Sequence, residues 1–136
     1  MPYAGQFEQI GRRVLVGWDG SREASHAISD AMPLLATAST VTVITVDSEE
    51  PSQRHGEVPG ADIALYLARH GVRTNVERTV SNGIGTGEVL LSRASDLEAD
   101  LLVMGAYGHA RVHELLFGGA TRTVLASATL PVLMSH

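Results

Sequence analysis

The segment whose residues are best suited to bind a ligand is GAYGHARVHELLFGGATRTV, from Gly105 to Val124. Gly105 and Gly108 enclose two residues, and nine residues then separate Gly108 from Gly118. Because glycine has no Cβ, its backbone can approach a ligand closely. A helix that begins just after Gly118 and Gly119 would present free backbone N–H groups, which attract phosphate. The segment is a candidate phosphate-binding loop, and glycines that serve only turns and close packing are the alternative.

Two other polar positions follow apolar runs. Asp19 follows RRVLVGW (residues 12–18), and Asp47 follows VTVITV (residues 41–46). Ligands of open parallel sheets bind beyond the carboxyl ends of the strands, so the loops Trp18-Asp19-Gly20-Ser21 and Thr45-Val46-Asp47 are candidates for ligand contact. For Asp19 the alternative is a purely structural role, because Asp-Gly-Ser is also a favourable turn sequence.

Strands and helices alternate in the predicted structure. The apolar runs predict strands at residues 12–18, 41–46, 72–80, 101–104 and 131–134. Apolar residues at helical spacing predict helices around residues 24–35, 61–68, 90–97 and 121–127. Such alternation implies crossover connections, and therefore a parallel sheet whose two faces are both covered by helices.

Local signals refine the predicted helix ends. Glu23 lies in the first turn of the first helix, where the helix dipole favours an acidic residue. Pro33 is expected to kink that helix or to end its regular part, because proline lacks an N–H group. Gly71 is expected to cap the end of the second helix.

The composition indicates one globular domain. The 136 residues suit a single domain spanning residues 1–136, with residues 1–11 as a loosely ordered N-terminal extension. A net charge of −5 argues against general nucleic-acid binding. The chain has no cysteine, no signal-peptide pattern and no apolar run near the roughly 18 residues that span a bilayer. We expect a cytoplasmic protein without membrane contact.

Several catalytic or metal-binding patterns are absent or incomplete. Gly83, Gly85 and Gly87 do not form a dinucleotide fingerprint, because Glu88 stands where its last glycine belongs. His109 and His113 have the spacing of zinc ligands, but no carboxylate completes a set, so surface histidines are the favoured interpretation. No Walker lysine and no G-x-S-x-G elbow occur. The sequence therefore favours a binding protein over an enzyme, with slow hydrolysis of a bound ligand as an open alternative.

The spacing G-x-x-G, nine residues, G resembles the nucleotide loop of the universal stress protein family. VLVGWDGS, ADLLVMGAYGH and PVLMSH resemble the first, fourth and last strands of that family, so the resemblance covers Arg12 to His136. It implies an open five-stranded parallel sheet in the order 3-2-1-4-5 with helices on both faces, which is a Rossmann-like, adenine nucleotide alpha hydrolase-like fold.

The resemblance also implies an adenine-nucleotide site between the first and fourth strands, with ATP as the expected ligand and Mg²⁺ or Mn²⁺ beside it. AMP and ADP stay open as alternatives. Asp19 would bind the adenosine portion, and the backbone of Val46 would recognise the adenine edge. The implied ribose and phosphate contacts are Gly105, Gly108, Gly118, Gly119, Ala120 and Thr121. The remaining expected site residues are Trp18, Met104, His109 and Arg111, the last of which has a solvated loop arginine as its alternative.

One position departs from the family pattern. Serine or threonine usually follows the third glycine, whereas this chain has Gly119. A missing hydroxyl donor to a charged phosphate costs about 1.5–3 kcal/mol, which weakens binding by about tenfold or more. Thr121 is a possible replacement donor. An adenine-nucleotide-binding regulatory protein is the leading hypothesis, and a dimeric stress-response scaffold without nucleotide is the second. An enzyme with an adenine cofactor is the third.

The resemblance further implies a partner. LPVLM (residues 130–134) is expected at a sheet edge, and exposed apolar edges invite pairing. Short members of the family pair there in antiparallel fashion, so a homodimer is expected. The chain also resembles one half of the tandem members of the family, and whether it is a separate relative of such a half stays open.

Overall fold

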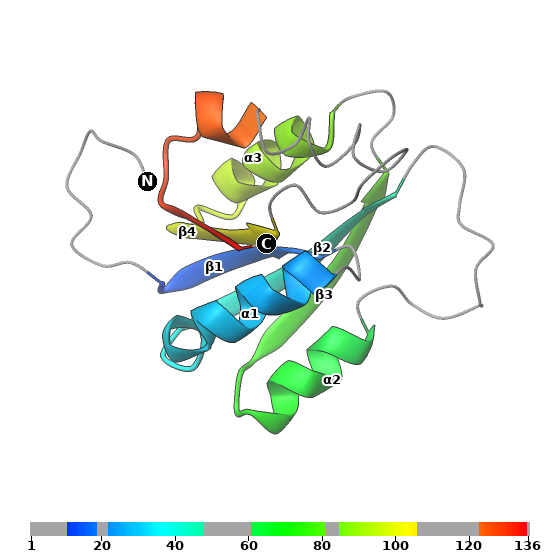
Figure 1. The fold of residues 1–136 in the computed structure, drawn as a ribbon, viewed down its shortest axis with the longest axis vertical. Helices are drawn as coiled ribbons and strands as arrows, with labels where there is room; N and C mark the ends of the chain where they lie inside the picture. The colour runs from blue at the N-terminus through cyan, green and yellow to red at the C-terminus, as the bar shows by residue number, and fades with distance from the viewer. Residues whose placement is uncertain (1–10, 19–21, 48–60, 81–84, 106–122, 136) are drawn as a thin grey trace.

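A five-stranded parallel sheet forms the centre of the molecule, with the strand order β3-β2-β1-β4-β5 (Figure 1). The computed structural model describes residues 11–18, 22–47, 61–80, 85–105 and 123–135. The elements are β1 (Arg13–Gly17), α1 (Arg22–Leu35), β2 (Thr40–Asp47), α2 (Ala61–Arg69), β3 (Thr74–Val80), α3 (Thr86–Asp96), β4 (Leu101–Gly105) and β5 (Val132–Ser135). Residues 123–127 are also helical. The predicted fold class and strand order are confirmed.

The central strand β1 has a partner on each side. Val14 lies opposite Val41 of β2 and opposite Leu101 of β4, and both pairings are parallel. Four of the five residues of β1 are buried. Their burial on both faces explains why the sequence is apolar without alternation at this point.

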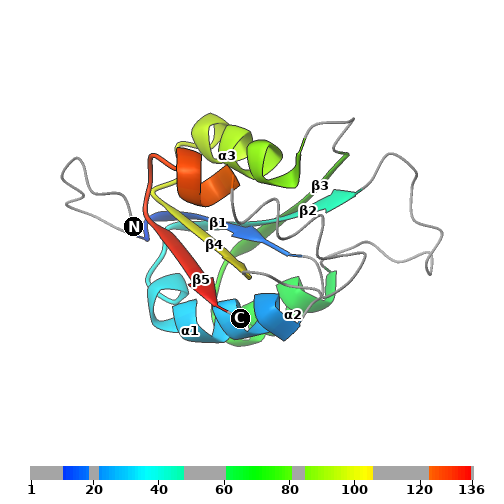
Figure 2. The ribbon, with the colours of Figure 1, turned by 45° about the horizontal axis from the view of Figure 1, so that its top comes forward.

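Helices cover both faces of the sheet (Figure 2). Helices α1 and α2 lie on one face, whereas α3 and residues 123–127 lie on the other. Helix α1 turns a stripe of small and branched residues towards the sheet, and its buried members are Ala24, Ala27, Ile28, Ala31 and Leu35. This is the stripe that the helical spacing predicts.

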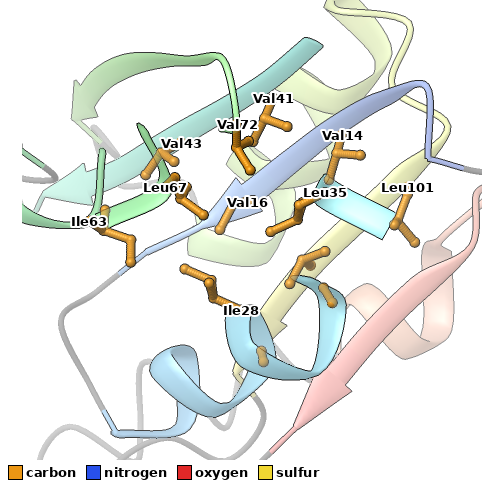
Figure 3. Close-up of a cluster of buried hydrophobic side chains, with 13 residues drawn as sticks. Val14, Val16, Ile28, Leu35, Val41, Val43, Ile63, Leu67, Val72 and Leu101 are labelled. Carbon is orange, nitrogen blue, oxygen red and sulfur yellow. The ribbon is translucent and has the colours of Figure 1, made fainter. Parts of the chain in front are cut away.

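Each face has its own core. On the α1 and α2 face, Val14, Val16 and Val43 pack with Ile28 and other residues from both helices (Figure 3). On the opposite face, the cluster comprises Leu15, Ile44, Leu90, Ala94, Leu102, Met104, Val124 and Leu130. Alternate residues of β1 thus contribute to opposite cores, which follows from the period of two in a strand.

The predicted cap at Gly71 is confirmed. Its φ is 78°, a left-handed conformation that glycine adopts without a steric penalty. The N–H of Val72 donates to the carbonyl of Leu67 over 2.9 Å, and the N–H of Gly71 donates to that of Ala68 over 3.0 Å. These two bonds form a Schellman motif, which ends α2 and turns the chain towards β3.

Pro33 does not end α1. The helix continues to Leu35, and the N–H of Ala36 still donates to the carbonyl of Met32 over 2.9 Å. Of the two expected effects of Pro33, the end of the helix is therefore wrong, and the kink stays a prediction. Because Leu35 is buried in the core, its packing favours two further helical residues after the proline.

The chain between α3 and β4 is held by a second Schellman motif. Glu98 adopts a φ of 54°, and the N–H of Ala99 donates to the carbonyl of Ala94 over 2.8 Å. The conformation is unusual for a residue with a side chain. Arg13 Nη1 donates to Glu98 Oε1 over 2.6 Å, and this exposed pair links the motif to β1.

Asp100 joins the starts of β1 and β4. Its carboxylate accepts hydrogen bonds from the backbone N–H groups of Gly11 (2.9 Å), Arg12 (3.1 Å) and Arg13 (3.2 Å). Its own N–H donates to the carbonyl of Arg13 over 2.9 Å. The carboxylate therefore holds the first residues of β1 from a position 89 residues away in the sequence.

In the described ranges, each helix is too short or too polar to span a bilayer.

Candidate functional site

The strand order reverses between β1 and β4. From β1 the chain proceeds to β2 on one side, whereas β4 lies on the other side and is followed by β5. Helix α1, which follows β1, packs on one face, and Val124 of the helix before β5 belongs to the core of the other face. Since the helices that follow β1 and β4 lie on opposite faces, the carboxyl ends of these two strands mark the switch point at which open α/β sheets bind ligands.

Gly105, the last residue of β4, touches the first turn of α1. A methyl group built on Gly105 would lie 2.7 Å from the backbone nitrogen of Ala24 and 2.8 Å from the carbonyl carbon of Glu23. Real side chains do not approach backbone atoms so closely, so only glycine fits at this position. The described contacts thus give Gly105 a packing role. Its expected contact with ribose and phosphate stays a prediction.

Trp18 and Val46 both lie at the carboxyl edge of the sheet. The N–H of Trp18 donates to the carbonyl of Ile44 over 3.0 Å, which extends the β1–β2 pairing by one residue. The half-buried Trp18 ring packs on the α1 and α2 face, while the half-buried Val46 packs on the α3 face. The structure therefore brings these two expected site residues to the same edge, with their side chains on opposite faces.

Met104 is fully buried in the core of the α3 face. Any contact between Met104 and a ligand would therefore come from its backbone. The other expected site residues lie outside the described ranges, namely Asp19, Gly108, His109, Arg111, Gly118, Gly119, Ala120 and Thr121.

A groove of about 260 Å³ lies beside Trp18, between the N-terminal halves of α1 and α2. Its other lining residues are Ser25, Ser29, Asp62, Ile63 and Tyr66. The lining side chains in the described ranges include a carboxylate, hydroxyls and rings.

The sequence places Thr45 in a candidate loop, but it does not predict the state of its hydroxyl. It is 5% exposed, and its hydroxyl has no hydrogen-bond partner in the part of the chain described here. Strand alternation places it on the face of Val43 and hence of α1 and α2. Buried hydroxyls almost always have a partner, so an unpaired one at this edge is notable. No sequence signal distinguishes it from the buried Thr42 on the same strand.

Glu23 and the Glu77–Arg93 pair lie in different parts of the fold. At the carboxyl edge, Glu23 in the first turn of α1 lies beside Gly105. Away from that edge, Glu77 of β3 accepts two hydrogen bonds from Arg93 Nη2, at 2.7 and 2.9 Å, and one from Nε at 3.1 Å. These hydrogen bonds raise the pKa of Arg93 above its ordinary value. Because the pKa of Arg93 is raised, the guanidinium stays charged, and the pair persists wherever the Glu77 carboxylate is ionised.

Comparison with known proteins decides the family. Residues 11–136 match the model of the universal stress protein family. The chain belongs to the universal stress protein family. A universal stress protein of Synechocystis is 30% identical over 130 residues, which cover 94% of this chain and 43% of the relative. The chain thus spans less than half the length of that relative.

Two solved universal stress proteins share the fold. One, in complex with cAMP, superposes with a TM-score of 0.61 at 22% identity, covering 92% of this chain and 97% of its own. Another, from Archaeoglobus fulgidus in complex with dAMP, has a TM-score of 0.60 at 19% identity, covering 94% of this chain and 100% of its own. At such identities these similarities concern the fold. For this universal stress protein, no group of three or more potential metal-binding side chains occurs within the described ranges.

Proposed function

We propose that this universal stress protein binds an adenine nucleotide and acts as a ligand-controlled regulatory protein in the stress response. The main supporting observation is the reversal of strand order at β1 and β4, because Gly105, the residue before the glycine-bearing segment in the sequence, ends β4 at the ligand edge of the sheet. The complexes of two universal stress proteins of this fold with cAMP and dAMP support the choice of adenine nucleotides.

The proposed ligand is ATP, with Mg²⁺ or Mn²⁺ bound to its phosphates. Asp19 would contact the adenosine portion and the backbone of Val46 the adenine edge. The phosphates would lie near Gly105 and against the N–H groups that precede residues 123–127. A nucleotide would thereby span the edge from β2 across β1 to β4, which are adjacent strands.

The unpaired hydroxyl of Thr45 supports this proposal. A buried polar group without a partner costs about 1–3 kcal/mol, and a ligand that supplied the partner would recover part of that cost. Thr45 directly precedes Val46, so the hydroxyl lies at the same end of β2 as the proposed adenine contact.

Regulation would follow from a change in the segment between Gly105 and Gly119. A ligand shifts a conformational equilibrium only when it binds one state more tightly than the other. Contacts between phosphates and this segment would provide such a preference, and would alter the surface that the cytoplasmic protein offers to a partner. In this proposal the activity is binding and not catalysis.

Titration with ATP tests the proposal against the alternative of a scaffold without nucleotide. We expect heat of binding and a rise in melting temperature at millimolar ATP, because a ligand that binds only the folded state stabilises it. A protein that gives neither signal with ATP, ADP or AMP would have lost nucleotide binding, as Gly119 allows.

Restoring a hydroxyl at position 119 should strengthen binding. We expect Gly119→Ser to bind ATP about tenfold more tightly than the original protein, because a hydrogen bond to a charged phosphate is added. Isothermal titration measures the change in Kd, and Gly119→Ala is the control because it adds a Cβ without a hydroxyl. Equal affinities for the serine and alanine variants would contradict the proposed phosphate position.

We also propose a homodimer through β5. This strand is at the edge of the sheet, and its four residues are half-buried. An unpaired edge offers a row of backbone groups to a second chain. Mass measurement at micromolar concentration should give twice the mass of one chain. A monomer under these conditions would contradict the proposal.

A further inference from the structure

The groove between α1 and α2 has two walls, each made of side chains one helical turn apart. Ser25 and Ser29 of α1 line one wall, and Asp62 and Tyr66 of α2 line the other. Residues four apart share one face of a helix, so each pair forms a continuous wall. The two helices lie on the same face of the sheet (Figures 1 and 2). All four wall residues are exposed, so the groove is open to solvent.

A buried polar group lies close to this groove. Trp18 lines the groove, and Thr45 lies beside Trp18 on the adjacent strand because the Trp18 N–H donates to the carbonyl of Ile44. Both side chains are on the α1 and α2 face of the sheet. The Thr45 hydroxyl is buried and has no hydrogen-bond partner in the described ranges. A polar ligand group that displaced the Trp18 ring would give this hydroxyl a partner.

The groove carries negative charge. Asp62 is the one charged side chain among its lining residues in the described ranges. Within the same ranges, no hydrogen bond or ion pair joins the Asp62 carboxylate to another residue. The arginines of the two helices, Arg22 and Arg69, do not line the groove. A carboxylate beside the rings of Trp18 and Tyr66 is complementary to a cation, because the faces of aromatic rings also attract positive charge.

We propose that this groove binds an arginine side chain of a partner protein. A guanidinium group is planar, so it stacks on aromatic rings and bonds to a carboxylate through two N–H groups at once. The ammonium group of lysine has neither property. The proposal goes beyond nucleotide binding and does not depend on it.

The surface next to the groove favours a polypeptide over a small guanidinium compound. Leu65 and Tyr66 of α2 are 53% and 41% exposed, and they are two of the three large hydrophobic side chains exposed in the described ranges. Leu65 does not line the groove, so a ligand confined to the groove would leave it uncovered. A partner with an apolar residue next to its arginine would cover both side chains.

The fluorescence of Trp18 provides a direct test, because this residue is the only tryptophan of the chain and lines the groove. The protein without nucleotide is titrated with the peptide Gly-Leu-Arg-Leu-Gly, whose ends are blocked. A second peptide has citrulline, a neutral analogue of the same shape, in place of arginine. We expect a saturable change at millimolar or lower concentrations of the arginine peptide, and binding of the citrulline peptide at least about fivefold weaker.

Three variants locate the peptide. Asp62→Asn should weaken the arginine peptide by about threefold to tenfold and leave the citrulline peptide within about twofold. Tyr66→Leu keeps the apolar bulk but removes the ring, so it should weaken the arginine peptide by about threefold. Ser29→Leu places a large side chain in the groove from an exposed helix position, and it should abolish binding.

Asp30→Asn is the matched control for charge. Asp30 is exposed on α1 and does not line the groove, so this variant removes an equal charge elsewhere. We expect its affinity for the arginine peptide to match that of the original protein within about twofold. The effect of Asp62→Asn should shrink with added salt, because salt screens exposed charges.

Several results would overturn the proposal. These are the absence of a saturable change in Trp18 fluorescence at millimolar peptide, equal affinities for the arginine and citrulline peptides, and equal affinities of Asp62→Asn and Asp30→Asn for arginine. Undiminished binding to Ser29→Leu would place the peptide elsewhere and would also overturn it. Because nucleotide is absent from these titrations, none of these results bears on the proposed binding of ATP.

Discussion

Gly105→Ala is expected to destabilise the protein by about 3 kcal/mol, near the upper end of the usual cost of overpacking. The added methyl group would lie 2.7 Å from the backbone nitrogen of Ala24 and 2.8 Å from the carbonyl carbon of Glu23. Backbone atoms of a helix cannot turn aside as a side-chain end can, so the first turn of α1 must move away from β4. For a domain of this size, thermal denaturation should show a melting temperature lower by about 10 °C.

Gly85→Ala is the control for this prediction. Nothing lies within 4 Å of the Cβ position at Gly85, and its φ of −64° suits any residue. We expect a change of less than about 1 kcal/mol, which is the cost of alanine at a helix N-cap. If the two variants melted at the same temperature, contact with α1 would not be the reason for glycine at position 105.

Asp100→Ala should lower stability by about 2–3 kcal/mol. Three backbone N–H groups donate to this carboxylate, and the N–H of Gly11 is in a buried residue that lacks full access to water as a substitute. Hydrogen bonds to charged groups contribute about 1.5–3 kcal/mol each, with less from the two at exposed residues. Chemical denaturation should show a lower midpoint with an unchanged slope.

Two further variants sharpen that test. Asp100→Asn keeps one acceptor oxygen and should lose about half as much stability. Glu98→Gln breaks the exposed pair with Arg13 and should change stability by less than about 1 kcal/mol, because exposed ion pairs contribute little. A denaturation midpoint for Asp100→Ala equal to that of Glu98→Gln would show that the carboxylate does not hold β1.

The sequence predicts the fold well because local pattern and burial agree. Residues 14–17 and Leu101–Gly105 carry no polar side chain, and both stretches are buried on two faces in the structure. The C-cap at Gly71 is equally predictable, since its left-handed φ is the reason for the glycine. The stop at Pro33 is predicted wrongly because the burial of Leu35 is a tertiary effect that local propensity does not contain.

The site is less predictable than the fold. The spacing of Gly105 with the later glycines draws attention to this edge, but it contains no information on the contact between Gly105 and α1. That contact, like the position of Glu23 beside it, depends on how α1 packs on β4, which follows about 80 residues later in the sequence. The unpaired hydroxyl of Thr45 likewise depends on what surrounds it in three dimensions.

The position of β1 in the middle of the sheet has a consequence for synthesis of the protein. A ribosome releases β1 and β2 early, whereas β4 emerges only after three further elements. Until then one edge of β1 is unpaired and apolar, which is a template for aggregation of nascent chains. Asp100 immediately precedes β4, and its carboxylate accepts hydrogen bonds from the start of β1. The segment that pairs with the free edge of β1 therefore also carries the carboxylate that holds the first residues of β1 in place.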